Sequence, residues 1–452
     1  MEVVIKNGII VNSLDIFKAD VGIQNGKIVA LGEDLSGDEN IEASGKYIFP
    51  GIIDVHTHME LPLGNTRSLD NFFTGTRSAA CGGVTTIIDF AFQGKEESLK
   101  ETINNRKNIA DPQVVIDYSL HVVITQMNEE TLNEIPDIIN NYGIPSFKLF
   151  MSSRNNKDWQ VNDGFMLDVL KTVSKHGGMV GVHCENGSII SNLTEKLLNS
   201  GKTSSEFFPL SRPDFSEVEA VSRAIILSEV PEANLYIFHI TCQRALEEVV
   251  KSKDKAQMVY TETCLPYLIY TDEKYKGLDA QNYIIIPPLR KEKDVQALWK
   301  GIQTGDIQVV SSDHCPFSKA QKKIGDSFFN TPAGIAAVES LLPLMYTEGV
   351  VGKKINLNQL VTVLAANPAK LFGLKNKGAI SIGKDADIVI FNPMEKKIIT
   401  SKSLHSECDY TIFEGKELNG YPEITICRGK TIYEKGKFVG EKGDGNFIER
   451  ST

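Results

Sequence analysis

Short apolar runs alternate with longer helical patterns through the middle of the chain. Candidate strands are 52–58, 85–90, 116–124, 146–150, 179–183, 235–239, 258–261 and 307–311, and helices such as 66–81 and 165–176 lie between them. Strands that alternate with helices are typical of a parallel sheet, and eight such units predict a (β/α)8 TIM barrel, an α/β fold. The number of strands is partly a matter of selection, since a short apolar run also fits a buried helix segment.

The two ends of the chain share a different pattern of short apolar runs separated by turn signals. Near the start, Asn7-Gly8 and Asn25-Gly26 follow such runs, and Asn-Gly is a strong hairpin signal. The same pattern of short apolar runs separated by turn residues returns at 387–391, 424–427 and 431–433. We therefore predict a smaller β-sandwich domain built from residues 1–48 and 378–452, and a barrel domain of residues 49–377.

Composition and charge limit the class of protein. The chain has 452 residues, 41% of them hydrophobic and 23% charged, which is ordinary for a globular protein. The net charge of -10 argues against a nucleic-acid surface. We expect no membrane segment, because no apolar run reaches about 18 residues. The start lacks the parts of a signal peptide, so we expect a cytoplasmic protein.

Seven cysteines form no Cys-x-x-Cys pair, which argues against a disulfide framework or a cysteine zinc site. We expect them to be reduced thiols. Cys184, Cys242 and Cys315 lie close in sequence to candidate site residues, and we expect them to pack as small apolar side chains.

Metal-compatible side chains fall at the ends of the predicted strands. His56 and His58 lie two apart on the first strand and therefore project to the same side. A strand-end histidine is ordinarily a hydrogen-bonded rim residue, and a lone lysine usually extends its amine to solvent. In a barrel, however, the carboxyl ends of the strands meet at the face that carries catalysis, so six such groups together predict a metal site. They are His56, His58, Lys148, His183, His239 and Asp313.

The chain resembles the cyclic amidohydrolases of the amidohydrolase superfamily, most closely the dihydropyrimidinase and D-hydantoinase branch. The resemblance spans nearly the whole chain. Matching stretches are 50–58, 82–90, 146–151, 183–187, 287–290, 312–317, 383–390 and 413–416. The resemblance implies a metal-dependent hydrolase that opens the amide bond of a cyclic ureide to an N-carbamoyl amino acid, in a barrel flanked by a β-sandwich. It also implies a homotetramer.

The resemblance further implies how two divalent metal ions, expected to be zinc, are held. His56, His58 and Asp313 hold one ion and His183 and His239 hold the other. Lys148, carbamylated by carbon dioxide, bridges both, because an ammonium group has no lone pair for a metal. A hydroxide between the ions attacks the ring amide, and Asp313 passes its proton to the leaving nitrogen. Manganese, cobalt and nickel suit the same ligands.

Three substrate-contact positions depart from the family pattern. Ser153 stands where the family has a tyrosine that stabilises the oxyanion, and losing one such donor typically costs about 10²–10³ in rate. Ile286 and Ala333 replace the family's serine and asparagine, so only backbone contacts survive there. The ring preference therefore stays open.

The sequence bears on three alternative functions. Allantoinase-like enzymes also lack the tyrosine and share features resembling Ser211-Arg212-Pro213, so allantoin or a related ureide is the alternative substrate. Dihydroorotase-like sequences carry a carboxylate-binding arginine where Glu60 stands, and an acid facing an anion is repulsive. The scaffold also occurs in non-catalytic binding proteins that have lost metal ligands, whereas every ligand position is filled here.

Overall fold

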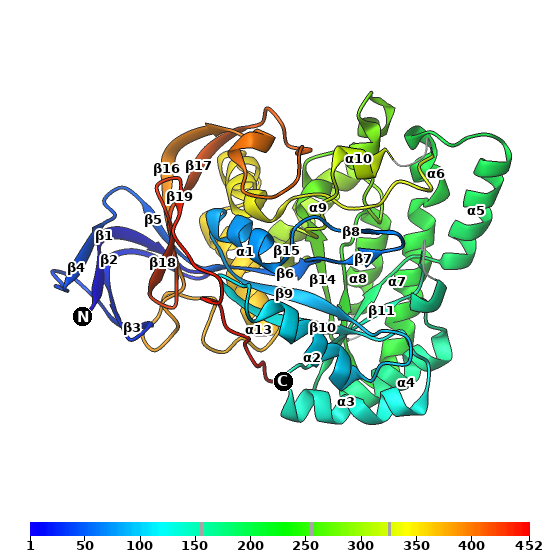
Figure 1. The fold of residues 1–452 in the computed structure, drawn as a ribbon, viewed down its shortest axis with the longest axis horizontal. Coiled ribbons are helices and arrows are strands. Elements are labelled where there is room, and N and C mark those ends of the chain that lie inside the picture. Colours follow the sequence, from blue (N-terminus) through cyan, green and yellow to red (C-terminus); the bar gives the residue numbers. More distant parts are fainter. Residues whose placement is uncertain (154–156, 254–256, 324–326) are drawn as a thin grey trace.

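The computed structural model describes residues 1–153, 157–253, 257–323 and 327–452. Figure 1 shows a small sheet that carries the N-terminus beside a larger barrel wrapped by helices. The barrel sheet has the strand order β15-β14-β13-β12-β11-β10-β9-β6, and its neighbours pair in parallel. A parallel bridge from Thr57 to His314 joins the two edges. The predicted barrel is confirmed.

All eight predicted barrel strands are present, two with the predicted bounds and six with shifted ends. They are β6 Ile52–Thr57, β9 Val84–Phe92, β10 Asp117–Val123, β11 Ser146–Phe150, β12 Met179–His183, β13 Asn234–Ile237, β14 Val259–Cys264 and β15 Val309–Ser311. Two shifts affect the site. β13 ends before His239, and β14 continues past the predicted end at residue 261 to include Glu262.

The described residues form thirteen α-helices. They are α1 Phe72–Cys81, α2 Leu99–Ala110, α3 Glu129–Asn141, α4 Asp163–Ser174, α5 Gly187–Asn199, α6 Phe208–Ser211, α7 Asp214–Glu229, α8 Gln243–Lys253, α9 Glu292–Thr304, α10 Lys319–Lys322, α11 Leu341–Leu344, α12 Leu357–Val361 and α13 Asn367–Leu371. Within the described part of the chain, none of them has the length and apolar character needed to cross a bilayer.

The helix predicted at 66–81 begins only at residue 72, so the prediction is wrong for residues 66–71. Thr66–Arg67 is strand β8, which pairs with β7, Pro62–Leu63, in a short hairpin. The hairpin turn includes Gly64 at φ 59°, a conformation that glycine adopts readily. α1 begins only after Asn71, whose side chain accepts a hydrogen bond from the backbone N–H of Thr74 and caps the helix.

The smaller sheet is built from both ends of the chain, as predicted. Its strands are β1 Val3–Val11, β2 Ile16–Gln24, β3 Lys27–Gly32, β4 Glu39–Glu42, β5 Tyr47–Pro50, β16 Ile388–Ile398, β17 Glu417–Cys427, β18 Lys430–Glu434 and β19 Lys437–Phe438. β5 lies between β1 and β16 and so joins the two ends. Isoleucines from both ends, including Ile48, Ile388 and Ile426, form a separate buried core.

Only one of the two Asn-Gly signals is a hairpin turn. Asn25 and Gly26 connect β2 to β3, with φ values of 51° and 72°. The turn expected at Asn7-Gly8 is wrong, because β1 runs through it with a register shift between Ile5 and Gly8. There the backbone N–H of Asn7 donates to Asp20 on β2, which holds the irregular residue inside the sheet.

The last residues of the chain return to the barrel. The N–H of Tyr118 donates to the carbonyl of Asn446, and the N–H of Ile448 donates to the carbonyl of Tyr118. Arg450 is buried and donates to the hydroxyls of Ser119 and Ser146. The end of the chain therefore packs against the barrel, although the strands that precede it, β16 to β19, belong to the smaller sheet.

Candidate active site

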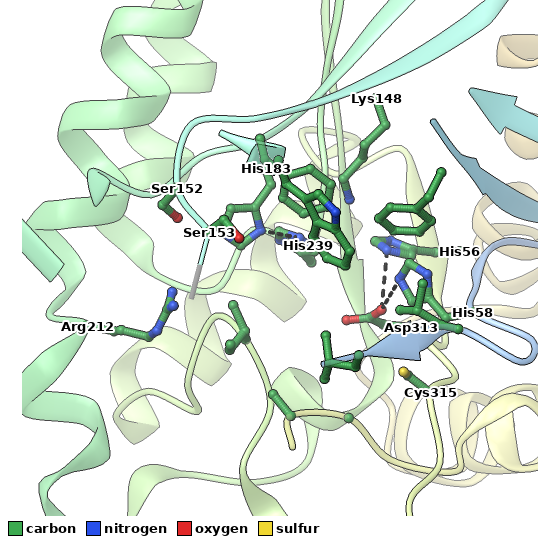
Figure 2. A pocket seen from close by; sticks show the side chains of 18 residues that line it. His56, His58, Lys148, Ser152, Ser153, His183, Arg212, His239, Asp313 and Cys315 are labelled. Atoms are coloured by element: carbon green, nitrogen blue, oxygen red, sulfur yellow. Dashed lines mark hydrogen bonds and ion pairs between the residues drawn. The ribbon is translucent and has the colours of Figure 1, made fainter. Parts of the chain in front are cut away.

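The six predicted metal-compatible side chains lie together at the carboxyl ends of the barrel strands (Figure 2). They line one cavity, and Ser153, Ile286 and Ala333 line it too. All nine site residues expected from the sequence therefore belong to a single cavity.

His56, His58 and Asp313 form one half of the cluster. Asp313 Oδ1 lies 3.3 Å from His56 Nε2 and 3.2 Å from His58 Nε2. Burial opposes ionisation of Asp313, but the facing imidazoles hold its pKa well below the usual range. One ligand atom from each of the three residues lies within 4.8 Å of the others, so the group has the spacing of a metal site.

His183 and His239 form the other half. His183 Nδ1 lies 3.0 Å from His239 Nε2, and both rings are buried. Burial lowers the pKa of both imidazoles, so each is neutral near pH 7 and keeps a lone pair. His239 and Asp313 have φ values of 39° and 51°, and strained non-glycine backbone of this kind clusters at functional sites.

Lys148 on β11 lies fully buried among aromatic rings. Its Nζ is 3.9 Å from the ring centroid of Phe238 and 4.9 Å from that of Phe90. Burial lowers the pKa of Lys148 to about 8. Among the described residues, no hydrogen bond or ion pair of this Nζ is found. The amine is therefore available for a reaction that removes its positive charge.

These residues fit a divalent metal centre. Neutral imidazoles and carboxylates are the ligands that zinc and related ions prefer. Within the described ranges, no hydrogen-bond partner is found for the buried Nδ1 atoms of His58 and His239. Glu185 contacts His183 Nε2 at 2.9 Å, which leaves Nδ1 of that ring directed at the cluster. Metal-binding histidines are commonly oriented by a carboxylate in this way.

Glu262 is a site residue that the sequence analysis missed. Its Oε1 lies 2.5 Å from His56 Nδ1, and its Oε2 accepts a hydrogen bond of 2.9 Å from the hydroxyl of Tyr236. Burial raises the pKa of Glu262 to about 8, so a positive charge placed nearby favours its ionised form. An acidic residue directly after a predicted buried strand was the signal that could have identified it.

Arg212 and Glu185 were also not predicted as site residues. The guanidinium of Arg212 lines the cavity, and its Nη1 donates to Glu185 Oε2. Arg212 thereby connects to His183 through a single carboxylate. Glu185 fell within a stretch that carried the family resemblance, and Arg212 fell within the allantoinase-like Ser211-Arg212-Pro213, so their positions were visible in the sequence although their role was not.

The rest of the cavity wall is largely apolar. Besides Arg212, the added lining residues are Leu61, Leu63, Phe92, Phe150, Ser152, Trp159, Cys315 and Gly334. Leu61 and Leu63 belong to the segment of the β7–β8 hairpin, which the sequence analysis did not predict.

Two expectations about neighbouring side chains have different outcomes. All seven cysteines are free and buried, and burial raises the pKa of Cys184, Cys242 and Cys315, as expected for packed thiols.

The inference that Glu60 faces the substrate is wrong. Its carboxylate lies 3.6 Å from Arg67 and accepts from the N–H of Phe72, and Glu60 does not line the cavity.

Comparison with known proteins yields close matches over the whole chain. The Amidohydrolase family matches residues 47–432, and the N-terminal domain of the urease alpha-subunit matches residues 1–48. The chain is 39% identical to a D-hydantoinase of Geobacillus stearothermophilus, covering 100% of this chain and 97% of that protein.

Solved structures agree. A D-hydantoinase from Bacillus sp. AR9 and a dihydropyrimidinase from Brevibacillus agri NCHU1002 each superimpose with a TM-score of 0.98 at 38% identity. Each match covers 100% of this chain and 99% of the other.

Proposed function

Because the chain belongs to the amidohydrolase family, we propose that it opens a cyclic ureide of the hydantoin or dihydropyrimidine type to an N-carbamoyl amino acid. The observation that carries the proposal is the convergence of four histidines, Lys148 and Asp313 in one buried cavity. The names of the similar proteins, D-hydantoinase and dihydropyrimidinase, support this ring class over allantoin.

Two divalent cations, zinc first among them, fit the donor set. His56, His58 and Asp313 would hold one ion and His183 and His239 the other, and Lys148, once carbamylated, would supply an anionic ligand to the centre. Bound cations of this kind lower the pKa of water and polarise a carbonyl group. The unpaired, buried amine of Lys148 supports the carbamate, because carbamylation would replace an uncompensated ammonium group with an anion that bound cations would compensate.

The chain's own residues transfer the proton and position the ring of the substrate. Asp313 is held ionised by the facing imidazoles, so its carboxylate can take a proton from water and deliver it to the leaving ring nitrogen. Phe92, Phe150 and Trp159 form an apolar wall that positions a flat ring and excludes bulk water. Glu262 keeps His56 oriented.

A substrate panel tests the proposal. Purified protein loaded with zinc or manganese is assayed on dihydrouracil, hydantoin, 5-substituted hydantoins, allantoin and dihydroorotate. We expect hydrolysis of hydantoins or dihydrouracil, and none by Lys148→Ala, which serves as the matched control. Turnover of allantoin alone would favour the alternative function. A protein inert on every ring in the presence of metal would favour the non-catalytic role.

The family resemblance also supports a homotetramer, which light scattering coupled to gel filtration tests. Seven free, buried cysteines support a reducing compartment such as the cytoplasm.

A further inference from the structure

One wall of the active-site cavity is polar although most of its lining is apolar. Ser152, Ser153 and Arg212 lie together on the side away from His56, His58 and Asp313 (Figure 2). The two serines directly follow β11 and Met151, so Lys148 and the serines of this wall are carried by one strand and its extension, whereas Arg212 follows α6. Arg212 is held by Glu185, which also contacts His183.

Hydrogen-bonding capacity on this wall is unused. The Oγ of Ser152 is buried and has no partner among the described residues. Arg212 is 2% exposed, and among the described residues only its Nη1 is found in a side-chain hydrogen bond, to Glu185. A buried polar group without a partner is costly, so a ligand that supplies an acceptor here gains affinity.

The charges behind the wall balance one another. Arg212 pairs with Glu185, and Arg290 pairs with Glu217 at 2.8 Å. Arg290 also donates to the backbone carbonyl of Arg212, which ties the two pairs together. The two buried guanidinium groups are already neutralised by two buried carboxylates, so no net positive charge is left to bind the carboxylate of a ligand. A neutral oxygen acceptor suits this wall, whereas an anion would bury an uncompensated charge.

We propose that the Ser152, Ser153 and Arg212 wall selects cyclic ureides whose ring substituent carries a neutral oxygen acceptor, such as a carboxamide group. The inference rests on the proposed function and narrows its substrate class. The hydroxyl of Ser152 donates to the substituent oxygen, and Arg212 faces it from the same wall, while the apolar lining contacts the ring.

Three hydantoins of nearly equal size test the proposal. They carry carbamoylmethyl, carboxymethyl or 2-methylpropyl at ring carbon 5. Each is assayed for kcat/KM with the zinc-loaded protein. We expect the carbamoylmethyl compound to exceed the 2-methylpropyl compound by about fivefold to tenfold, the value of one neutral hydrogen bond, and the carboxymethyl compound to be slowest.

Two variants test whether Ser152 causes the preference for the carbamoylmethyl compound. Ser152→Ala should lower the ratio of carbamoylmethyl to 2-methylpropyl turnover by about fivefold. Ser200→Ala, at the exposed end of α5, should leave that ratio unchanged. Calorimetry with the products gives a readout independent of catalysis: N-carbamoylasparagine should bind more tightly than N-carbamoylleucine, and Ser152→Ala should narrow the difference.

The outcomes separate the two proposals. If the 2-methylpropyl or carboxymethyl compound is the best substrate, or if Ser152→Ala leaves the ratio unchanged, this inference is overturned and the proposed function stands. If none of the three rings is opened and dihydrouracil is also inert, the proposed function falls, and the inference falls with it.

Discussion

Glu262→Gln is expected to weaken metal binding without unfolding the protein. The carboxylate of Glu262 meets three donors: Oε1 faces His56 Nδ1 at 2.5 Å and the backbone N–H of His239 at 3.3 Å, and Oε2 faces the hydroxyl of Tyr236 at 2.9 Å. A glutamine can keep its oxygen toward His56 and His239, and its NH2 group then donates to the hydroxyl of Tyr236, which can accept. The substitution removes the negative charge, so the charge-assisted bond that holds His56 Nε2 toward the metal cluster becomes a weaker, neutral one.

The size of the effect follows from these contacts. Removing a carboxylate that orients a metal-binding histidine typically costs 10- to 100-fold in metal affinity, which is about 1.4–2.7 kcal/mol. Because the glutamine oxygen can still face His56 and only the charge is lost, we expect a loss near tenfold. In a Tyr236→Phe background the NH2 group loses the acceptor that keeps the oxygen toward His56, so Glu262→Gln should cost more than it does alone.

The assay is a zinc competition titration against a chromophoric chelator, with thermal unfolding measured in parallel. Glu130→Gln on α3 makes the same chemical change at an exposed position and is the matched control. A folded Glu262→Gln protein that binds zinc within about twofold of the control would refute the claim that Glu262 orients His56. Equal losses in both Tyr236 backgrounds would refute the role of the Tyr236 hydroxyl in orienting the glutamine.

Four further predictions concern the same cavity. Lys148→Ala should lose bound metal and activity, with partial rescue by a short carboxylic acid; elemental analysis that finds two metals and normal turnover would exclude the carbamate. Asp313→Asn should lower kcat by at least about 10²-fold, the ordinary contribution of a general acid–base group, and steady-state kinetics with an unchanged rate would remove it from that role. Prolonged dialysis against a chelator should abolish hydrolysis, with recovery on adding zinc or manganese; activity that survives a metal content near zero would contradict a metal-dependent reaction. Ser153→Tyr should shift kcat/KM toward unsubstituted rings, because a phenol fills space beside Arg212; an unaltered preference across the hydantoin panel would show that this position does not set specificity.

The barrel and the six metal-compatible residues were predictable because local sequence determines them. A buried strand alternates its side chains, so His56 and His58 had to share a side, and strand ends in a barrel meet at one face. His239 lies beyond its predicted strand, but this shift of two residues still leaves it at the same face.

The missed features depend on contacts between distant segments. Glu262 and His56 are 206 residues apart, and no local pattern indicates that one orients the other. Glu60 was expected to face the substrate because of its place in the sequence, but the β7–β8 hairpin brings Arg67 to its side and α1 offers a backbone donor. At Asn7-Gly8, a side chain of the neighbouring strand decided between a turn and a bulge.

The position of β5 between β1 and β16 has a consequence for synthesis on the ribosome. β5 ends at Pro50 and its partner β16 begins at Ile388, so about 340 residues separate them. At roughly 5–20 residues per second, β5 emerges about 17–70 s before its partner strand exists. For that time its unpaired edge can capture another nascent chain, as exposed edges do. Slow expression at low temperature or chaperone supply should therefore affect the yield of soluble protein more than the stability of the finished fold.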